Sequence, residues 1–392
     1  MYRQIRQVQV FFLVAFVGLA AGLVYWQLIR AEGLLSRGNN PRPIIAELRI
    51  RRGAIYASDG TLLAETTLDA GGLAQRHYPH PAAAPLVGYY SLRYGTAGLE
   101  AAFDGVLRGQ PRLEGVSNAP WLANLMHRPS EGDSITTTLH LPGQQMAVEA
   151  LANWAETGAA VVMNARTGEV LVMASYPTFD PNTLESERDA LIEDPRAPLL
   201  NRVTQGLFPS GDLVRLVGLI GLAETNRPIP AQPLTLPLAD LLKPLPPPEF
   251  LETARNLGLD RDIDFALPTV AGTMPGSWPD RAAELGTTPL HVALIGSALM
   301  QGGLAPMPSL IAGATPSRHR LMRAETAAAA GPIVGDFSAL ALPDVTGNQP
   351  LSWYLGLFDG EPPLVIVVVA TTSEVDADAA RQIGEQILAA GG

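Results

Sequence analysis

The amino-acid sequence predicts an α/β (α+β) protein in which a membrane-spanning helix and a β-rich region precede a domain with an antiparallel sheet flanked by helices. Three observations support this prediction. An apolar run without charges covers residues 8–29, an Asp-Gly pair at positions 59 and 60 separates two β-rich runs, and residues 158–175 read as two strands joined by a turn. A helical pattern at residues 377–388 would pack on the resulting sheet.

Composition excludes several classes of function. The 392-residue chain is 47% hydrophobic and 17% charged, which is typical of a globular protein large enough for two domains. Its net charge of −11 and scattered arginines indicate no nucleic-acid partner. The absence of cysteine excludes disulfides, thiolate catalysis and Cys-containing zinc sites. Because His77 and His80 have no acidic or cysteine neighbours, we expect neither a metal nor a cofactor.

The N-terminus has the pattern of an uncleaved signal anchor. Arg3 and Arg6 precede the apolar run at 8–29, which has about the 20 residues that a membrane helix needs. A cleaved signal peptide has a shorter apolar core and a small-residue cleavage site, whereas this run ends in Tyr25 and Trp26. We therefore expect a cytoplasmic tail at 1–7, a transmembrane helix at 8–29, and a single-pass cell-membrane protein whose bulk is extracytoplasmic. The alternative is a buried core helix.

The next region is predicted to be rich in β-structure. Arg51 to Ala64 reads as a hairpin around Asp59-Gly60, and it is followed by characteristic segments at 87–95 and 98–100. These segments resemble class B penicillin-binding proteins, which carry an Arg-Gly-x-Ile segment with a later Asn/Asp-Gly turn just after their membrane anchor. The match is closest to the pedestal of the actinobacterial penicillin-binding protein A group. The resemblance implies a pedestal or dimerisation-type domain at residues 30–150.

The resemblance continues through the C-terminal part of the chain. The segments that carry it are the predicted helix at 142–155, the hairpin at 158–175, the loop at 176–182, the stretch at 285–290 and the Gly302-Gly303 turn. They imply a transpeptidase-like, penicillin-binding domain at residues 151–392.

Two segments of this domain depart from a regular pattern. Residues 225–260 are rich in proline, which excludes long helices, so we expect the helical lobe there to be shortened to a loop and a short helix at 249–257. The low-complexity segment 324–331, with four consecutive alanines, is interpreted as a surface linker.

The first catalytic motif of the family is altered. Where the family reads Tyr-Pro-Pro-Gly-Ser-Thr-x-Lys, residues 208–215 place Asp212 at the nucleophile position and Arg215 at the lysine position. The only lysine is Lys243, so the chain contains no Ser-x-x-Lys. A guanidinium stays protonated and cannot act as a base, and an aspartate would form an anhydride that water destroys. We interpret Asp212 as a helix N-cap that forms a surface ion pair with Arg215.

The other two motifs are altered as well. The chain contains no Ser-x-Asn, and the Lys-Thr-Gly motif appears as Val345-Thr346-Gly347. In the family this lysine and threonine engage the substrate carboxylate, a charge-assisted contact that valine cannot replace. The resemblance therefore implies that none of these positions is catalytically functional.

The leading hypothesis is a catalytically degenerate homologue, a pseudoenzyme, in peptidoglycan cell-wall synthesis. It would act as a scaffold or allosteric partner of a polytopic lipid II polymerase in the membrane. One alternative is an active D,D-transpeptidase or weak carboxypeptidase that forms an acyl-serine through Ser210, although its i+3 residue, Leu213, is no base. A third possibility is a sensor that binds peptidoglycan stem peptides or β-lactams noncovalently.

Overall fold

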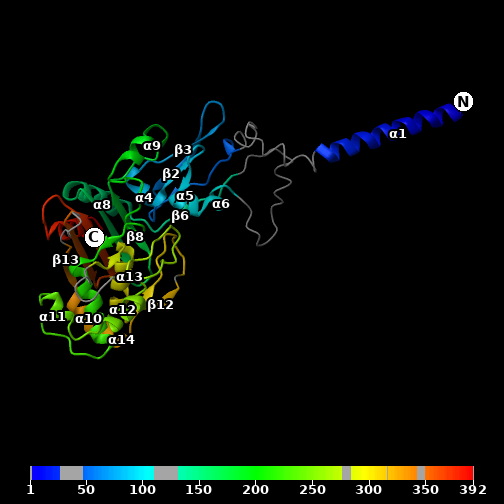
Figure 1. The fold of residues 1–392 in the computed structure, drawn as a ribbon. Helices are drawn as coiled ribbons and strands as arrows, with labels where there is room; N and C mark the ends of the chain where they lie inside the picture. Colours follow the sequence, from blue (N-terminus) through cyan, green and yellow to red (C-terminus); the bar gives the residue numbers. More distant parts are fainter. Residues whose placement is uncertain are drawn as a thin grey trace.

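The computed structural model describes residues 2–26, 47–109, 131–275, 284–315, 317–341 and 349–391. The first element, α1 (Tyr2–Val24), contains a stretch at residues 5–24 that is long and apolar enough to cross a membrane (Figure 1). The helix begins at Tyr2, so most of the segment expected to be a cytoplasmic tail is helical. Residues 27–29 of the predicted span lie outside the described residues.

The pedestal is built on a four-stranded sheet with the order β3-β2-β1-β6. β1 is antiparallel to β2 and parallel to β6, while β2 is antiparallel to β3. The predicted Asp-Gly turn joins β1 to β2: Gly60 has a φ of +85°, and the Thr61 amide donates to the Asp59 carboxylate at 2.9 Å. The strands are β1 (Ile55–Tyr56), β2 (Leu62–Leu68), β3 (Ala74–His77) and β6 (Ile135–Thr136).

Short helices and a second hairpin complete the pedestal. They are η2 (Pro81–Ala83), α4 (Ala84–Val87), β4 (Tyr89–Ser91), β5 (Gly95–Ala97), α5 (Gly98–Ala102) and α6 (Asp104–Leu107). Leu86, Leu99 and Leu107 are fully buried in an apolar core that continues into the C-terminal domain. The region is therefore a mixture of strands and short helices around one apolar core.

The C-terminal domain is organised around a five-stranded sheet with the order β13-β14-β15-β7-β8. Every neighbouring pair is antiparallel, as the sequence predicted. The central strand β15 is apolar at consecutive positions because helices cover both of its faces. The strands are β7 (Thr157–Asn164), β8 (Val170–Tyr176), β13 (Asp336–Ala341), β14 (Leu351–Phe358) and β15 (Leu364–Thr371).

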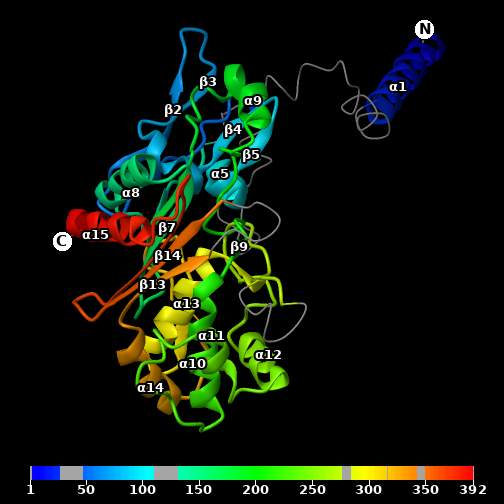
Figure 2. The same ribbon diagram turned by 60° about the vertical axis from the view of Figure 1, so that its left-hand side comes forward.

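The two faces of this sheet pack against different helices (Figure 2). α8 (Leu141–Trp154) and α15 (Ala379–Gly391) cover one face, where Leu151 and Ile383 meet Ile366 and Val368. α13 (Pro289–Met300) covers the opposite face. The predicted domain boundary at residue 150 falls inside α8 and stays a prediction.

A helical lobe lies at the end of the molecule away from the pedestal (Figures 1 and 2). The helix α10 packs on the other three helices of the lobe. The helices are α10 (Val214–Glu224), α11 (Leu238–Leu242), α12 (Pro247–Asn256) and α14 (Ala324–Val334).

Two expectations about this lobe need correction. The segment 324–331 is not a surface linker: it forms most of α14, and its Thr326, Ala327 and Ala330 are buried. Alanine has the highest helix propensity, and its small side chain lets α14 pack close to its neighbours. The proline-rich region holds α11 in addition to the expected short helix, because prolines stand just before or at the start of α11 and α12, where no amide donor is needed.

The remaining elements are short. They are α9 (Leu184–Glu193), the 3₁₀ turn η3 (Gly211–Leu213), the pair β9 (Phe208–Pro209) and β10 (Gly286–Thr287), and the pair β11 (Leu304–Pro306) and β12 (Arg318–Arg320). Together β9 and η3 lead the chain into α10, so they position the residues at which the sequence predicts an altered motif.

Candidate functional site

The segment before α10 is fixed against the edge of the sheet. β9 pairs antiparallel with β10, and the Ser210 amide donates to the Leu285 carbonyl at 2.8 Å. The indole Nε1 of Trp353 donates to the Pro209 carbonyl at 3.0 Å, and the Phe208 ring meets the same indole edge to face at 5.9 Å. These contacts give the start of α10 a defined position relative to β14.

Asp212 and Arg215 form an ion pair at the start of α10. The Asp212 Oδ1 accepts a hydrogen bond from Arg215 Nε at 3.1 Å and lies 3.0 Å from Arg215 Nη2. The Arg215 Nη1 donates to the Leu236 carbonyl, which lies in the proline-rich segment. The Arg215 side chain is 11% exposed and that of Asp212 is 46% exposed, so the pair is partly buried.

The expectation that Asp212 caps the helix is wrong. The chain enters α10 through η3, so Asp212 lies inside the 3₁₀ turn, and neither η3 nor α10 has a side-chain cap. The tighter turn begins at Gly211, one residue before the predicted cap Asp212, so Asp212 already lies inside a helical turn. The contact that Asp212 makes at the start of α10 is therefore its ion pair with Arg215.

Ser210, the alternative nucleophile, is buried. Its exposed fraction is 1%, and its carbonyl accepts from the Leu213 amide at 2.9 Å, which closes the 3₁₀ turn. Its i+3 neighbour is an apolar residue, as the sequence indicated. A peptide carbonyl cannot approach a buried hydroxyl unless the surrounding chain moves.

Gly211 closes the space between η3 and the edge strand β13. Its φ is +52°, and a Cβ built on it would lie 2.3 Å from the Leu340 carbonyl oxygen and 2.4 Å from the Ala341 Cα. The two backbones are therefore in direct contact. Only glycine combines this conformation with this approach.

The other predicted positions are separate from this segment or lie outside the described residues. Val345, Thr346 and Gly347 belong to the second group, and their place in the fold is not described. Lys243, the only lysine, is exposed at the end of α11. Within the described ranges, no group of three or more metal-ligating side chains is found near His77, His80 or elsewhere.

Sequence reasoning missed a buried histidine at the start of α13. The Nε2 of His291 lies 3.0 Å from the Arg261 carbonyl and its Nδ1 lies 2.8 Å from the Thr288 hydroxyl, which also caps the helix. A carbonyl can only accept, so Nε2 carries the proton. Burial lowers the pKa of His291, with a smaller opposing effect from the Arg261 carbonyl. The Thr-x-x-His spacing was the available signal for this capping arrangement.

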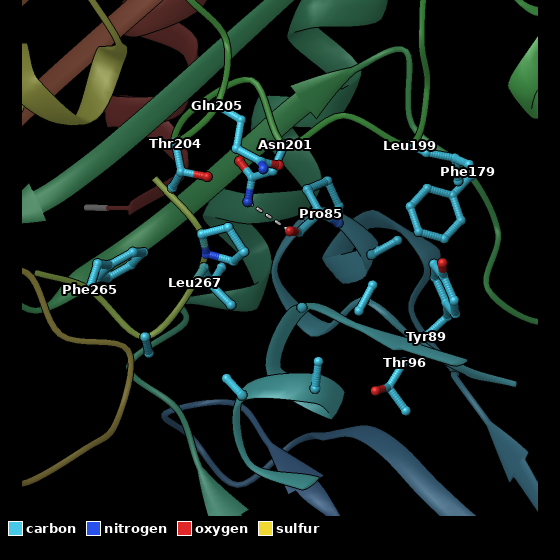
Figure 3. Close-up of a pocket in the computed structure, with 18 residues that line it drawn as sticks. Pro85, Tyr89, Thr96, Phe179, Leu199, Asn201, Thr204, Gln205, Phe265 and Leu267 are labelled. Carbon is cyan, nitrogen blue, oxygen red and sulfur yellow. Dashed lines mark hydrogen bonds between the residues drawn. The ribbon is translucent and has the colours of Figure 1, made fainter. Parts of the chain in front are cut away.

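Sequence reasoning also missed a cavity between the pedestal and the C-terminal domain (Figure 3). Its volume is about 630 Å³. Residues 84–102 of the pedestal line one side, and residues from 179–205 and 265–268 line the other. The Asn201 amide donates to the Pro85 carbonyl at 2.9 Å and so ties the two sides together. No single stretch of sequence contains this cavity.

Comparison with known families finds matches in two parts of the chain. The profile of the "Penicillin binding protein A dimerisation domain" matches residues 52–135, and the profile of the "Penicillin binding protein transpeptidase domain" matches residues 158–214. The second match ends at the first residue of α10, two residues beyond Asp212.

Curated relatives agree with these matches. The chain is 32% identical to the peptidoglycan D,D-transpeptidase PbpA of Mycolicibacterium smegmatis over 271 residues, which is 66% of this chain and 53% of the relative. It is 35% identical to the peptidoglycan D,D-transpeptidase MrdA of Escherichia coli over 130 residues, 31% of this chain and 20% of the relative. The chain thus matches about half the length of its PbpA relatives.

Solved structures show the same fold. The crystal structure of PBPA from Mycobacterium tuberculosis superposes with a TM-score of 0.75 at 21% identity, covering 87% of this chain and 99% of that one. The penicillin G acyl-enzyme complex of the same M. tuberculosis protein gives a TM-score of 0.72 at 24% identity, with 87% and 99% covered. This confirms the predicted α/β transpeptidase fold with a preceding dimerisation domain.

Proposed function

We propose that this chain, which is homologous to the class B penicillin-binding proteins of the penicillin-binding protein A group, is a catalytically inactive relative of the peptidoglycan D,D-transpeptidases. Its role is to bind a polytopic lipid II polymerase in the membrane, as a scaffold or allosteric partner. The bulk of the chain lies outside the cytoplasm, held by α1, the one helix among the described residues that is long and apolar enough to cross a membrane.

One observation carries the proposal: the Asp212–Arg215 ion pair at the start of α10. Acyl transfer needs a hydroxyl nucleophile and a base that can take its proton. Here the aspartate oxygen is engaged by two guanidinium nitrogens, and a guanidinium cannot act as a base. The arrangement supports a structural use of positions that an acyl-transfer enzyme would use for chemistry.

Two further features support inactivity. Ser210 is buried, and Gly211 brings η3 into backbone contact with β13 beside it. A substrate strand that entered between η3 and β13 would have to separate these backbones. Both features indicate that the space between η3 and β13 is closed and is not an open substrate cleft.

The test of inactivity is the intact mass of the full-length chain, purified in detergent, after incubation with excess benzylpenicillin. The M. tuberculosis PBPA, of which a penicillin G acyl-enzyme structure exists, serves as the reactive control under the same conditions. We expect the control to gain the mass of one benzylpenicillin and this chain to remain unmodified. An adduct that disappears in Ser210→Ala would instead establish an active acyl-serine enzyme.

The binding role rests on the retained pedestal and the apolar helix. The pedestal keeps a packed core, and the dimerisation-domain profile covers most of it. We therefore expect the polymerase to contact the pedestal and α1, with the C-terminal domain further from the partner.

Site-specific photo-crosslinking in native membranes tests the partner. A crosslinking residue replaces Leu68, which is 42% exposed at the end of β2, and a matched control replaces Val375, which is 58% exposed before α15. We expect a polytopic peptidoglycan polymerase to be captured from position 68 and not from position 375. Capture from position 375 alone, or capture of no such protein from either position, contradicts the proposal.

A further inference from the structure

The cavity between the pedestal and the C-terminal domain has the properties of a ligand site. Its volume of about 630 Å³ lies within the range of about 300–1,000 Å³ that is typical of small-molecule sites. Figure 3 shows Tyr89 and Thr96 of the pedestal facing Thr204 and Phe265 of the C-terminal domain across it. A molecule bound here would contact both domains at once.

The lining disfavours an ionised ligand. Among the described residues that line the cavity, none carries a charged side chain. An ion bound here would lose part of its hydration without a counter-charge to offset the loss. The free carboxylates of stem peptides and β-lactams are therefore poor matches for this cavity.

The lining also disfavours a pure hydrocarbon. Thr204 is 1% exposed, and its hydroxyl has no hydrogen-bond partner within the described part of the chain. In Figure 3 this hydroxyl points toward the middle of the ring of labelled side chains. A buried hydroxyl without a partner is unfavourable, so it marks a place where a ligand atom gains a hydrogen bond.

Further uncharged hydrogen-bonding groups accompany Thr204. Gln205 and Thr96 contribute an amide and a hydroxyl to the lining. The Tyr89 ring packs edge to face on Phe179 at 6.1 Å, and Phe265 lies on the opposite side, so apolar ring surface borders the same space. A ligand that fits must be uncharged, rich in hydrogen-bonding groups, and apolar on part of its surface.

We infer that this cavity binds an uncharged pyranose that carries an acetamido group, an N-acetylhexosamine. Its hydroxyls suit Thr204 and Gln205, its ring C–H surface suits the aromatic side chains, and its acetamido group adds a neutral donor and acceptor. The choice of the acetamido sugar among uncharged polar ligands rests on the proposed role in cell-wall synthesis. Because both domains line the cavity, binding of the sugar would stabilise the contact between the pedestal and the C-terminal domain.

The test is saturation-transfer NMR on the full-length chain in lipid nanodiscs, which avoids detergents with sugar headgroups. The probes are N-acetylglucosamine, glucose, which lacks the acetamido group, and glucosamine, which carries a cationic amine. We expect a signal for N-acetylglucosamine, a weaker one for glucose and none for glucosamine. Equal signals for all three sugars, or none for N-acetylglucosamine, overturn the inference.

Two variants locate the binding. Ala102→Trp places a bulky ring at the edge of the cavity and is expected to abolish the signal, whereas the control Ala152→Trp on the exposed face of α8 leaves it unchanged. Thr204→Val removes the unpartnered hydroxyl, so it should weaken binding about three- to tenfold while raising the melting temperature of the ligand-free protein. Unchanged affinity in both cavity variants contradicts the assignment.

Failure of the sugar-binding inference is distinguishable from failure of the proposed function. Crosslinking at position 68 measures the polymerase partner and needs no sugar, while the NMR experiment needs no partner. Loss of the sugar signal with retained crosslinking removes the inference alone. A sugar signal without crosslinking removes the scaffold role and leaves the cavity as a glycan site.

Discussion

The replacement Glu100→Gln gives a sharp test of how the pedestal is held together. The Glu100 carboxylate on α5 is completely buried between two arginines. Arg52 Nε donates to its Oε2 at 3.0 Å and Arg76 Nε donates to its Oε1 at 2.6 Å. The Tyr78 hydroxyl lies 3.4 Å from the same Oε1. The side chains of Arg52 and Arg76 are 2% and 3% exposed, so these charges have little access to water.

The size of the expected destabilisation follows from the contacts that remain after the charge of Glu100 is removed. Gln keeps the shape of Glu100, but among the described residues Arg76 then has no carboxylate partner, and Arg52 retains only Asp104 at 2.6 Å. Burial lowers the pKa of Arg52, but the charges of Glu100 and Asp104 outweigh this effect and leave the pKa raised. The replacement removes the charge of Glu100 and leaves the effect of burial in place. Breaking a buried ion pair on one side costs about 3–5 kcal/mol. At about 1.4 kcal/mol per factor of ten, local opening becomes about one hundred to a few thousand times more frequent.

The assay is amide hydrogen exchange by mass spectrometry of the full-length chain, read on peptides that cover β1 and β2. The matched control is Glu131→Gln, which breaks an exposed pair with Arg51 at 3.7 Å and should change exchange by no more than a few-fold. We expect the large acceleration only in Glu100→Gln, and only in the pedestal. If the two variants differ by less than tenfold in these peptides, the buried carboxylate does not hold the pedestal together.

Two further predictions concern the C-terminal domain. Gly211→Ala should destabilise the protein by about 1–3 kcal/mol more than Gly258→Ala, because both residues have a positive φ but only at Gly211 does the new Cβ meet backbone atoms. Chemical denaturation followed by circular dichroism measures the difference, and equal losses would contradict close packing of η3 on β13. For His291, whose pKa is lowered by burial, the unfolded chain binds the proton more readily, so stability is complete above pH about 6.5 and falls as the pH drops from there toward the folded-state pKa, with a slope of at most about 1.4 kcal/mol per pH unit. His291→Gln should flatten this slope and the exposed His319→Gln should not, which unfolding midpoints from pH 4 to 8 would decide.

Features that are encoded locally could be predicted from the sequence. The Asp59-Gly60 turn and the strands in 158–175 depend on residues close together in the chain, so the turn residues and the apolar periodicity were sufficient. The Asp212–Arg215 pair was predicted for the same reason, since three residues in a helical turn bring two side chains together.

Two local predictions failed because a competing effect was given too much weight. The alanine run at 324–331 was interpreted as low complexity, although alanine favours helices more than any other residue. The capping role of Asp212 assumed that α10 starts at that residue, but the positive φ of Gly211 starts a 3₁₀ turn first.

Other features could not be predicted because they depend on distant contacts. The Glu100 cluster joins residues 24 and 48 positions away in the chain, which neither periodicity nor a motif relates. The cavity requires three separate segments, 84–102, 179–205 and 265–268, to meet across the seam between the pedestal and the C-terminal domain. Sequence patterns indicate the structure of each segment, but they do not show that the three segments lie side by side in the fold.

The choice of arginine at position 215 bears on the proposed function. Its guanidinium makes contacts on two sides: Nε donates to Asp212, with Nη2 3.0 Å from the same carboxylate oxygen, while Nη1 donates to the Leu236 carbonyl. A lysine offers all of its donors from one nitrogen, so it could not reach both acceptors in this geometry. Arg215, which the resemblance aligns with the catalytic lysine of the family, is here suited to tie α10 to the proline-rich segment. Under the proposed function, this contact between two segments serves the fold and not proton transfer, because a scaffold depends on fixed surfaces and needs no activated hydroxyl.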